Sequence, residues 1–389
     1  MHIGRTVFAQ LLDGVPKDEF RKCVNRYRGN YRVRTFSCWD QFLSMVFAQL
    51  AYRDSLRDIE TCLKAMQPKL YHTGIRGHVC RSNLADANES RDWRIWADFA
   101  HVLIGPARKL YAQDDFGLEL DQMAYVLDST TIDLCLSLFP WARFRKRKAA
   151  IKLHALMDLH GRIPCFIHVT DGITHDLFSL DLLVFEPGAF YIFDRAYTDF
   201  ARLHRLTQNM AFFVTRAKKN LDFARRSSQL VDKTTGLRAD QTILLRGPKS
   251  SQLYPDSLRR VCFFDAKHHN RLVFLTNNFS LPALRIAQLF KCRWQIELFF
   301  KWIKQYLRIK AFYGTSPNAV KTQIWIAITV YVLVAILKKQ LRLIQNLSEI
   351  LQILSISLFE QVPMIQLFTT ISPETQETNC HKQLVLFVS

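Results

Sequence analysis

Residues 151–171, IKLHALMDLHGRIPCFIHVTD, decide the fold of this chain. Two apolar runs, 151–159 and 163–171, flank a His-Gly dipeptide. Runs of this kind bounded by turn residues are typical of strands, so the segment predicts a β-hairpin with a tight turn at the dipeptide. A similar run, MAYVLDST at 123–130, predicts a third strand beside the hairpin.

Helices and strands alternate in the next part of the chain. HDLFSLDLLVF at 175–185 is typical of a short helix, and FYIFDRAY at 190–197 contains a strand. DFARLHRLTQNM at 199–210 predicts a helix, and AFFVTRA at 211–217 predicts a strand. Three adjacent strands followed by helix, strand, helix and strand predict an α/β sheet with one antiparallel side.

Different patterns flank this sheet. Residues 1–120 carry apolar side chains at helical spacing, and Ser37 or Asp40 is a candidate cap for one of the helices. Short strand-like runs separated by Gly, Pro and Asn predict a β-rich insertion over 216–280. The sequence therefore predicts an α/β core that contains this insertion at 121–310, a helical N-terminal domain at 1–120 and a helical C-terminal region with a loose tail at 311–389.

The charge of the chain predicts a polyanionic partner. Lys and Arg number 53 against 34 Asp and Glu, which gives a formal net charge of +19. The basic residues recur along the chain, in RKCVNRYRGNYRVR at 21–34, RFRKRKAAIK at 143–152 and RAKKNLDFARR at 216–226. Such spread basicity favours a long groove for nucleic acid over a tethering tail, and an anionic membrane surface is the rival partner.

Cysteines and apolar runs narrow the class of protein further. The nine cysteines include no CxxC pair, which argues against a zinc site or a disulfide framework and favours a reducing compartment. The mixed, polar N-terminus does not resemble a secretory signal. The longest apolar run, IWIAITVYVLVAIL at 324–337, is too short to span a membrane comfortably, so we expect a buried core helix and a cytoplasmic protein without a membrane partner.

Residues 290–304, FKCRWQIELFFKWIK, mix charged and large apolar side chains in a pattern typical of a helix. Because an α-helix turns by about 100° per residue, Phe290, Arg293, Glu297 and Lys304 fall within an arc of about 60° beside the apolar arc. One interpretation is a partly solvated salt-bridge face, since Arg and Glu four residues apart are neighbours on a helix. The other is a functional stripe at the edge of the core.

Two aspartates follow apolar strand segments. Asp128 stands in YVLDSTTI and Asp194 in YIFDRAYTD, and strand ends in open α/β sheets project side chains into a crevice. Each aspartate alone is explained as well by a turn or a helix cap. Together with Glu297 they form a set of acids that repel one another unless cations neutralise them, and carboxylate oxygens favour Mg²⁺ or Mn²⁺. Two such ions support phosphoryl transfer.

These motifs together resemble the insertion-sequence transposases of the DDE, ribonuclease-H-like superfamily, in the branch with a Tyr-x2-Arg-x3-Glu-x6-Lys signature. The signature is matched at Phe290, Arg293, Glu297 and Lys304, with Phe in place of Tyr. The first aspartate segment is similar to VLDSTTIDLCLSLFPWARFRKRKAAIKLHALMDLHGRIP and the second to FDRAYTDF. The resemblance covers about residues 75–368.

The resemblance implies a ribonuclease-H-like catalytic core in which Asp128, Asp194 and Glu297 hold two Mg²⁺ ions, for which Mn²⁺ can substitute. Arg293 and Lys304 would grip the DNA backbone near the scissile phosphate. The implied reaction is cut-and-paste transposition: strand cleavage at the element's terminal inverted repeats, then transfer of the freed 3′-hydroxyl to target DNA. A homodimer on paired ends, at the bacterial nucleoid, is also implied.

This sequence departs from the family pattern at Phe290, and the aromatic residue expected in the insertion is not fixed. Phe290 lacks the phosphate-contacting hydroxyl of the family Tyr. Members of the branch can pass through a hairpin end held by an aromatic residue of the insertion, for which the candidates here are Tyr254, Phe263 and Phe264.

Further residues are candidates for DNA contact. Arg195 follows the second aspartate, and the basic run that ends in Arg145, Lys146, Arg147 and Lys148 is expected in a loop between strands. The N-terminal domain is a candidate DNA-binding or auxiliary domain through its basic run with Tyr27 and Tyr31, and Asp176 is expected to cap a helix.

Two functional alternatives remain. A catalytically dead or domesticated DNA-binding protein would keep the basic surfaces without the reaction. A general metal-dependent nuclease would cut DNA that lacks terminal repeats.

Overall fold

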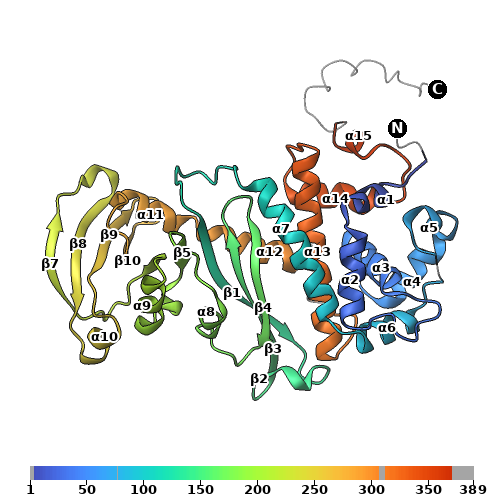
Figure 1. Ribbon diagram of the computed structural model, residues 1–389, viewed down its shortest axis with the longest axis horizontal. Helices are drawn as coiled ribbons and strands as arrows, with labels where there is room; N and C mark the ends of the chain where they lie inside the picture. The colour runs from blue at the N-terminus through green and yellow to red at the C-terminus, as the bar shows by residue number, and fades with distance from the viewer. Residues whose placement is uncertain (1–3, 77, 306–311, 370–389) are drawn as a thin grey trace, which may run out of the picture.

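A mixed sheet and a block of helices lie side by side in this protein, in a computed structural model that describes residues 4–76, 78–305 and 312–369 (Figure 1). The described residues form one sheet of ten strands. The strands are β1 (Ala124–Leu134), β2 (Arg143–Arg145), β3 (Lys148–Asp158), β4 (Ile163–Asp171), β5 (Phe190–Phe193), β6 (Phe212–Arg216), β7 (Phe223–Gln229), β8 (Leu237–Leu245), β9 (Leu258–Asp265) and β10 (Asn270–Thr276).

The order of the strands confirms an α/β core of ribonuclease-H-like type. β3 pairs antiparallel with both β1 and β4, whereas β5 pairs parallel with β1 and β6 pairs parallel with β5. The resulting order is β4-β3-β1-β5-β6, with its antiparallel side formed by the predicted hairpin. Parallel neighbours need a crossover connection, and α8 (Phe178–Leu182) and α9 (Phe200–Gln208) lie in those connections.

The hairpin that decides the fold is present where it was predicted. β4 covers 163–171, as expected, and its turn is closed by Gly161, whose φ is +70°. A Cβ on Gly161 would lie 2.2 Å from the ring of Tyr111, so only glycine fits between the turn and the helix behind it. The strand predicted at 123–130 is too short, because the polar residues after it keep pairing with β3 as far as Leu134 opposite Ala149.

The predicted β-rich insertion contains β7, β8, β9 and β10, which pair antiparallel in sequence order. β10 also pairs with β6, so the insertion extends the core sheet and does not form a sheet of its own. A buried ion pair, Arg259 Nη2 to Asp240 Oδ2 at 2.7 Å, joins β9 to β8. β7 begins in the basic run at 216–226 and ends after it, and its mostly polar sequence, FARRSSQ, gave no strand signal.

The helices found between Val7 and Tyr111 confirm a helical N-terminal region. Ser37 caps α3 and Asp40 completes a capping box, so both candidate residues act at the same helix start. The helices are α1 (Val7–Leu11), α2 (Lys17–Arg26), α3 (Cys38–Leu50), α4 (Leu56–Ala65), α5 (Gln67–Thr73), α6 (Arg81–Ser90) and α7 (Arg94–Tyr111).

The C-terminal helices share a core with the N-terminal ones. α13 packs against α7, α3 and α6, as the side-by-side ribbons in Figure 1 show. The division of the chain at 120 and 310 therefore stays a prediction, and the expected loose tail lies outside the described residues. The C-terminal helices are α13 (Pro317–Gln340), α14 (Leu347–Ser357) and α15 (Met364–Thr369), and the helices between them and β8 are α10 (Pro248–Leu253), α11 (Ala283–Lys291) and α12 (Trp294–Gln305).

α13 is a core helix. It has 24 residues and is therefore longer than the fourteen-residue apolar run, and it is the one helix among the described residues with the length and composition to cross a membrane. However, 94% of its most apolar window is buried inside the fold. Neighbouring helices, α7, α3, α6, α12 and α14, pack against it.

Candidate active site

Asp128 and Asp194 come together at the point where two parallel strands separate. Leu127 of β1 pairs with Phe193 of β5, so the next residue on each strand is one of the two aspartates. β5 ends there, and the Asp194 side chain accepts a hydrogen bond of 2.8 Å from the backbone N–H of Arg195 at the start of a 3-10 helix, Arg195–Tyr197. Asp128 lies within β1 and not at its end, because β1 continues along β3.

Glu297 approaches these strands from α12, which packs on β1. The single helix expected over 290–304 is wrong. α11 ends at Lys291 and α12 begins at Trp294, and between them the N–H groups of Arg293 and Gln295 bond to carbonyls three residues back. This two-residue break places Phe290 on one helix and Glu297 on the first turn of the next.

Arg293 forms ion pairs with Glu297 of α12 and with Asp128 of β1. Its Nη2 lies 2.6 Å from Glu297 Oε1, and its Nη1 lies 3.2 Å from Asp128 Oδ2. The Asp128 and Arg293 side chains are each about one-fifth exposed, whereas Glu297 is 57% exposed. At the other end of α12, Lys304 Nζ donates a hydrogen bond of 2.7 Å to the carbonyl of Thr131, which fixes the helix along β1.

The electrostatics of Asp128 reflect a crowded acidic site. Burial raises the pKa of Asp128 from its ordinary 3.8 to about 6, and the nearby charges of Glu297 and Asp194 raise this pKa further. The N–H of Ser129 and the guanidinium of Arg293 lower the same pKa without cancelling the increase. A carboxylate in such surroundings is stabilised when a cation replaces the proton.

The residues present fit a hard divalent cation. Asp128 and Glu297 line one open cleft of about 410 Å³, together with Thr130 and Lys301. The Arg293 guanidinium stands between the two carboxylates, where a positive charge is needed. Among the residues that the structure describes, no three Asp, Glu, His or Cys side chains are already close enough to ligate one ion. Coordination by all three acids would therefore require their side chains to converge.

A layer of polar contacts behind Asp128 was not identified from the sequence. Ser129 Oγ donates to Asp176 Oδ1 at 2.8 Å, and Lys152 Nζ lies 3.2 Å from the same oxygen. Asp176, expected to cap a helix, instead precedes a five-residue helix and holds the strand next to the first aspartate. The unbroken polar run DSTT at 128–131, directly after an apolar strand segment, is the signal that could have pointed to this layer.

His154 belongs to the same layer. It lies opposite Ser129 on β3, is 1% exposed, and its Nε2 is 3.0 Å from Thr170 Oγ1. Burial lowers the pKa of His154 to about 4. The imidazole is therefore neutral at physiological pH.

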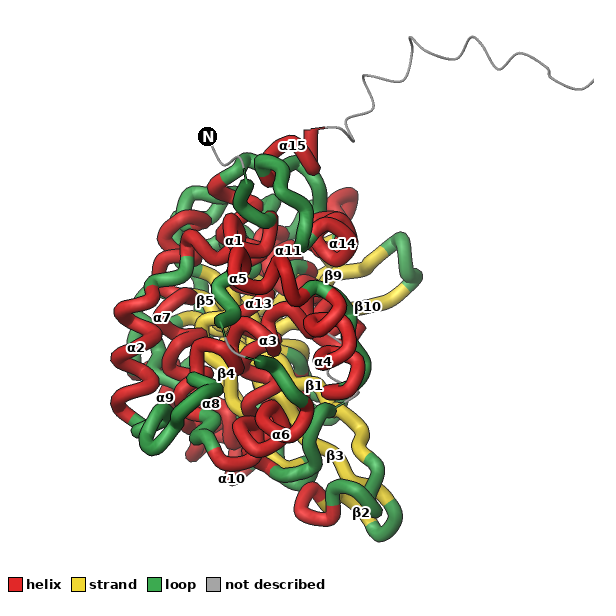
Figure 2. Tube along the Cα trace, turned by 90° about the vertical axis from the view of Figure 1, so that its right-hand side faces the viewer, coloured by secondary structure: helices red, strands yellow, loops and turns green. Residues whose placement is uncertain are grey.

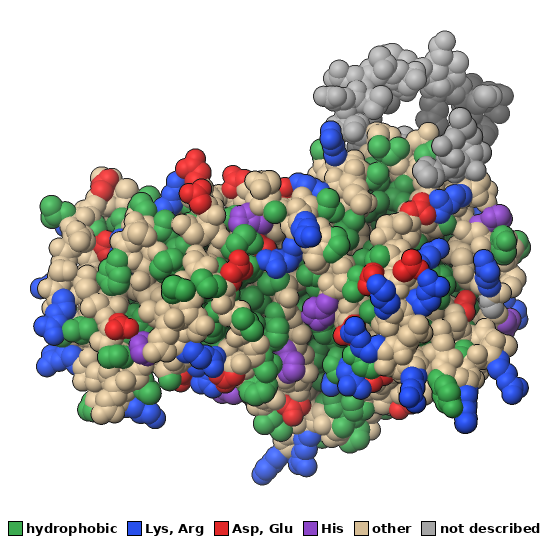
Figure 3. Space-filling view, viewed as in Figure 1, with side chains coloured by type: hydrophobic (Ala, Val, Ile, Leu, Met, Phe, Trp, Pro, Cys, Tyr) green, Lys and Arg blue, Asp and Glu red, His purple; other side chains and the backbone are tan. Residues whose placement is uncertain are grey.

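The basic run at 145–148 forms the tip of a β-hairpin and not a loop between separate strands. Arg145 of β2 pairs with Lys148 of β3, and all four basic side chains from 145 to 148 are exposed. Figure 2 shows this tip extending beyond the rest of the fold, and Figure 3 shows Lys and Arg side chains at the same end of the sheet. Arg195 is also exposed, at the start of the 3-10 helix.

Aromatic residues named from the sequence lie mainly in the core. Phe290 is 8% exposed, packs against Phe274 with ring centroids 4.9 Å apart, and carries the Arg293 guanidinium over its ring. This burial suits Phe290 to position Arg293. Tyr254 is 1% exposed and Phe263 is 7% exposed, and Phe264 is half-buried.

Comparison with known proteins gives two family matches. Residues 119–333, more than half of the chain, match the model of the "Transposase DDE domain", and residues 3–76 match a domain of unknown function, DUF4372. A putative transposase of Sinorhizobium fredii is 31% identical over 78% of this chain and 85% of its own length.

Other similar proteins carry transposase names. A probable transposase of an insertion sequence element from Geobacillus stearothermophilus is 32% identical over 57% of this chain and 59% of its own length. Among solved structures, a piggyBac transposase synaptic complex with hairpin DNA matches 95% of this chain and 82% of its own, with 10% identity and a TM-score of 0.45.

Proposed function

The chain belongs to the DDE transposase family, and from that premise we propose that it binds the terminal inverted repeats of its own insertion sequence and catalyses metal-dependent strand cleavage and transfer. The substrate is double-stranded DNA, first at the element's ends and then at a target site. The Tyr-Arg-Glu-Lys branch within the family stays a prediction. We expect the chain to act in the cytoplasm at the nucleoid, as a homodimer assembled on paired ends.

One observation carries the proposal: Asp128 and Asp194 follow paired residues of adjacent parallel strands, and Arg293 links Asp128 to Glu297. Asp128 and Glu297 thereby line one cleft, and Asp194 follows the strand beside it, although 66 residues separate the two aspartates in sequence and 103 separate Asp194 from Glu297. Acidic side chains placed near one another destabilise the fold unless a cation neutralises them. The arrangement therefore supports a catalytic role for these acids.

The carboxylates of Asp128, Asp194 and Glu297 would hold two Mg²⁺ ions. Ions bound there supply activation of an attacking hydroxyl and stabilisation of the departing oxygen in phosphodiester transfer. Ser129, Asp176 and the rest of the polar layer would keep β1 in place around Asp128.

The basic side chains of the site would position the DNA backbone. Arg293, directly before α12, and Lys304, near its end, flank Glu297 in sequence, and a guanidinium released from carboxylates is a bidentate ligand for phosphate. Arg195 and the exposed tip at 145–148 would extend the track on either side of the cleft. Phe290 would act indirectly, by supporting Arg293.

The test is DNA cleavage in Mg²⁺ with a duplex that carries the gene's own flanking ends, compared with a shuffled duplex of equal length. The wild type should cut only the true ends, and Asp128→Asn should bind them without cutting. Equal cutting of both duplexes by the wild type would identify a general nuclease. Binding without cutting by the wild type would identify an inactive DNA-binding copy.

A further inference from the structure

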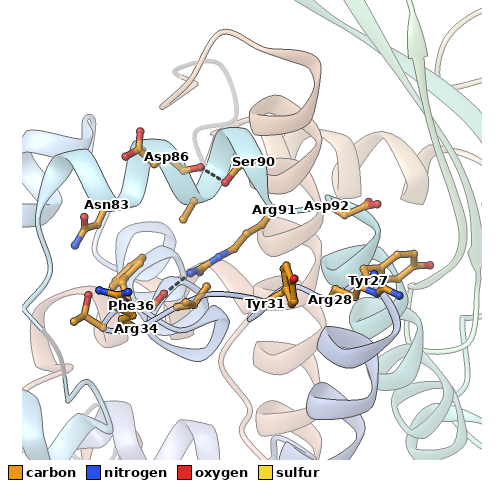
Figure 4. A pocket seen from close by; sticks show the side chains of 14 residues that line it. Tyr27, Arg28, Tyr31, Arg34, Phe36, Asn83, Asp86, Ser90, Arg91 and Asp92 are labelled. Atoms are coloured by element: carbon orange, nitrogen blue, oxygen red, sulfur yellow. Dashed lines mark hydrogen bonds between the residues drawn. The ribbon is translucent and has the colours of Figure 1, made fainter.

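A second cleft lies among the N-terminal helices, away from the three acids. It has a volume of about 610 Å³ and separates α6 from the segment that joins α2 to α3. Figure 4 shows Asn83, Asp86 and Ser90 on α6 along one wall, with Tyr31 and Arg34 of the joining segment on the opposite side. We name this segment, residues 27–36, the basic loop.

The basic loop is held in one conformation by its contacts with the core. A Cβ on Gly29 would lie 2.6 Å from Ile95 Cδ1 and 2.7 Å from Cys38 Sγ, so the backbone is pressed against the core at this point. Asn30 Oδ1 accepts a hydrogen bond of 2.8 Å from the N–H of Cys38. On either side, Arg28 and Arg32 have φ values of +52° and +57°. Non-glycine residues in the left-handed region persist where surrounding contacts impose them, and such strain concentrates at functional sites.

Arg91 fixes the loop relative to α6. It directly follows the last residue of α6, and its Nη1 donates to the carbonyl of Ser37 at 3.0 Å and to Gln41 Oε1 at 2.9 Å. Its Nη2 donates to the carbonyl of Phe36, at the end of the loop. Asn318 of α13 binds the carbonyl of Arg91 in turn, at 2.7 Å. Both walls of the cleft are therefore positioned before any ligand arrives.

The loop presents cations that no acid neutralises. Arg28 and Arg34 are exposed and form no ion pair within the described ranges of the chain, and Arg32 stands over the ring of Tyr31, which is 64% exposed. Nearby cations on the helices are paired by contrast: Arg94 with Asp92 at 2.6 Å is one such pair. Three unpaired guanidinium groups on a rigid loop favour a polyanion, and an exposed tyrosine among them is common where nucleic acid binds.

The opposite wall carries groups suited to reading bases. Asn83 and Asp86 are three residues apart on α6, so they lie on one face of the helix. Across the parts of the chain that the structure describes, neither side chain has a hydrogen-bond or ion-pair partner. In a major groove, an asparagine amide pairs with adenine and an aspartate accepts from the amino group of cytosine.

We propose that this cleft is a DNA-end recognition site, in which α6 enters the major groove and reads bases through Asn83 and Asp86 while Arg28, Arg32 and Arg34 bind the flanking phosphates. It rests on the proposed function, because it supplies the sequence preference that action at the element's own ends requires. The N-terminal helices would then select the DNA, and the acids of the sheet would cut it.

Equilibrium binding of the full-length protein to the two duplexes described above, without Mg²⁺, tests this site. Asp86→Asn and Asn83→Ala should each lower the preference for true ends over shuffled DNA by about tenfold, with little change on shuffled DNA. Glu89→Ala is the matched control, since Glu89 is exposed on the same helix but does not line the cleft. Asp86 is itself exposed, so its substitution removes no packing.

The loop is tested by the salt dependence of the same binding. Arg28→Ala and Arg34→Ala should weaken binding to both duplexes equally, and each should reduce the slope of log K against log salt by about one. Arg246→Ala should leave the slope unchanged, because this exposed arginine directly follows β8, at the opposite end of the molecule from α6 in Figure 1.

Two results would overturn the recognition site, and they differ in what else they overturn. If the wild type binds both duplexes equally, end recognition fails and the proposed function fails with it. If the wild type prefers true ends and the Asn83 and Asp86 variants keep that preference in full, the proposed function stands and only this cleft is refuted. Circular dichroism of each variant confirms that the helices remain folded.

Discussion

Asp128→Asn should stabilise the protein at neutral pH when no metal is present. The pKa of Asp128 is raised from 3.8 to about 6, so the folded state binds the proton more tightly than the unfolded state does. Because each pKa unit corresponds to about 1.4 kcal/mol, the ionised carboxylate costs about 3 kcal/mol of folding free energy at pH 7.5. Asparagine is isosteric and uncharged, and its oxygen can keep the contact of 3.2 Å with Arg293.

The sign of the pH dependence follows from the direction of the shift. For a carboxyl whose folded pKa is raised, the cost is absent below the unfolded pKa and grows as the pH rises through the folded pKa. The stability difference between Asp128→Asn and the wild type should therefore fall from about 3 kcal/mol at pH 7.5 to about 1 kcal/mol at pH 4.5. Comparison of the two proteins at each pH removes from the result the titrating groups that do not interact with residue 128.

Urea unfolding in a chelator, followed by tryptophan fluorescence, measures this difference. Added Mg²⁺ should reduce this difference: at ten times its dissociation constant the ion stabilises the wild type by about 1.4 kcal/mol, and the variant gains less. An Asp128→Asn protein that is less stable than the wild type at pH 7.5 would refute the reasoning. In that case the ion pair with Arg293 outweighs burial and repulsion, and the site is not poised for a cation.

Three further outcomes are expected. Glu297→Gln should abolish cleavage and leave DNA binding nearly unchanged, because the side chain is 57% exposed and acts through its charge; loss of both activities together would indicate a structural role. Arg293→Ala should weaken DNA binding and reduce the salt slope by about one, and an unchanged slope would count against the phosphate contact. His154, whose pKa is lowered to about 4 by burial, should make the wild type lose up to about 3 kcal/mol as the pH falls from 7 to 4, because the unfolded imidazole takes up a proton near pH 6.5 and the folded one does not. His154→Asn should remove that dependence in an acid titration of stability, and an equally steep loss in the variant would assign it to other groups.

Much of the core fold is a local property of the sequence. The hairpin at 151–171 is set by two apolar runs and a glycine turn, and strand position follows from that periodicity. The alternation of helix and strand after it leaves few topologies, because crossovers between parallel strands have one hand. The capping of α3 by Ser37 and Asp40 is likewise local, since both hydrogen bonds close within one turn.

The residues of the candidate site were predicted from the sequence, but their arrangement in space was not. Asp128, Asp194 and Glu297 were identifiable because each combines a charged side chain with an apolar element and a family motif. That the first two are neighbours depends on the pairing of β1 with β5, which is a contact between distant segments. The break before Trp294 was hidden because both helices keep apolar residues at helical spacing, and periodicity does not register an interruption of two residues.

The sequence by itself determined the basic character of the chain, the strands and helices of its core, and the acids and bases available for chemistry. Tertiary structure decided which of them meet: Arg293 with both Asp128 and Glu297, the union of the insertion with the core sheet through β10 and β6, and the cleft between α6 and the basic loop. The physical reason is that composition and periodicity act over a few residues. Ion pairs, burial and pKa shifts depend instead on groups that only folding brings within a few ångströms of one another.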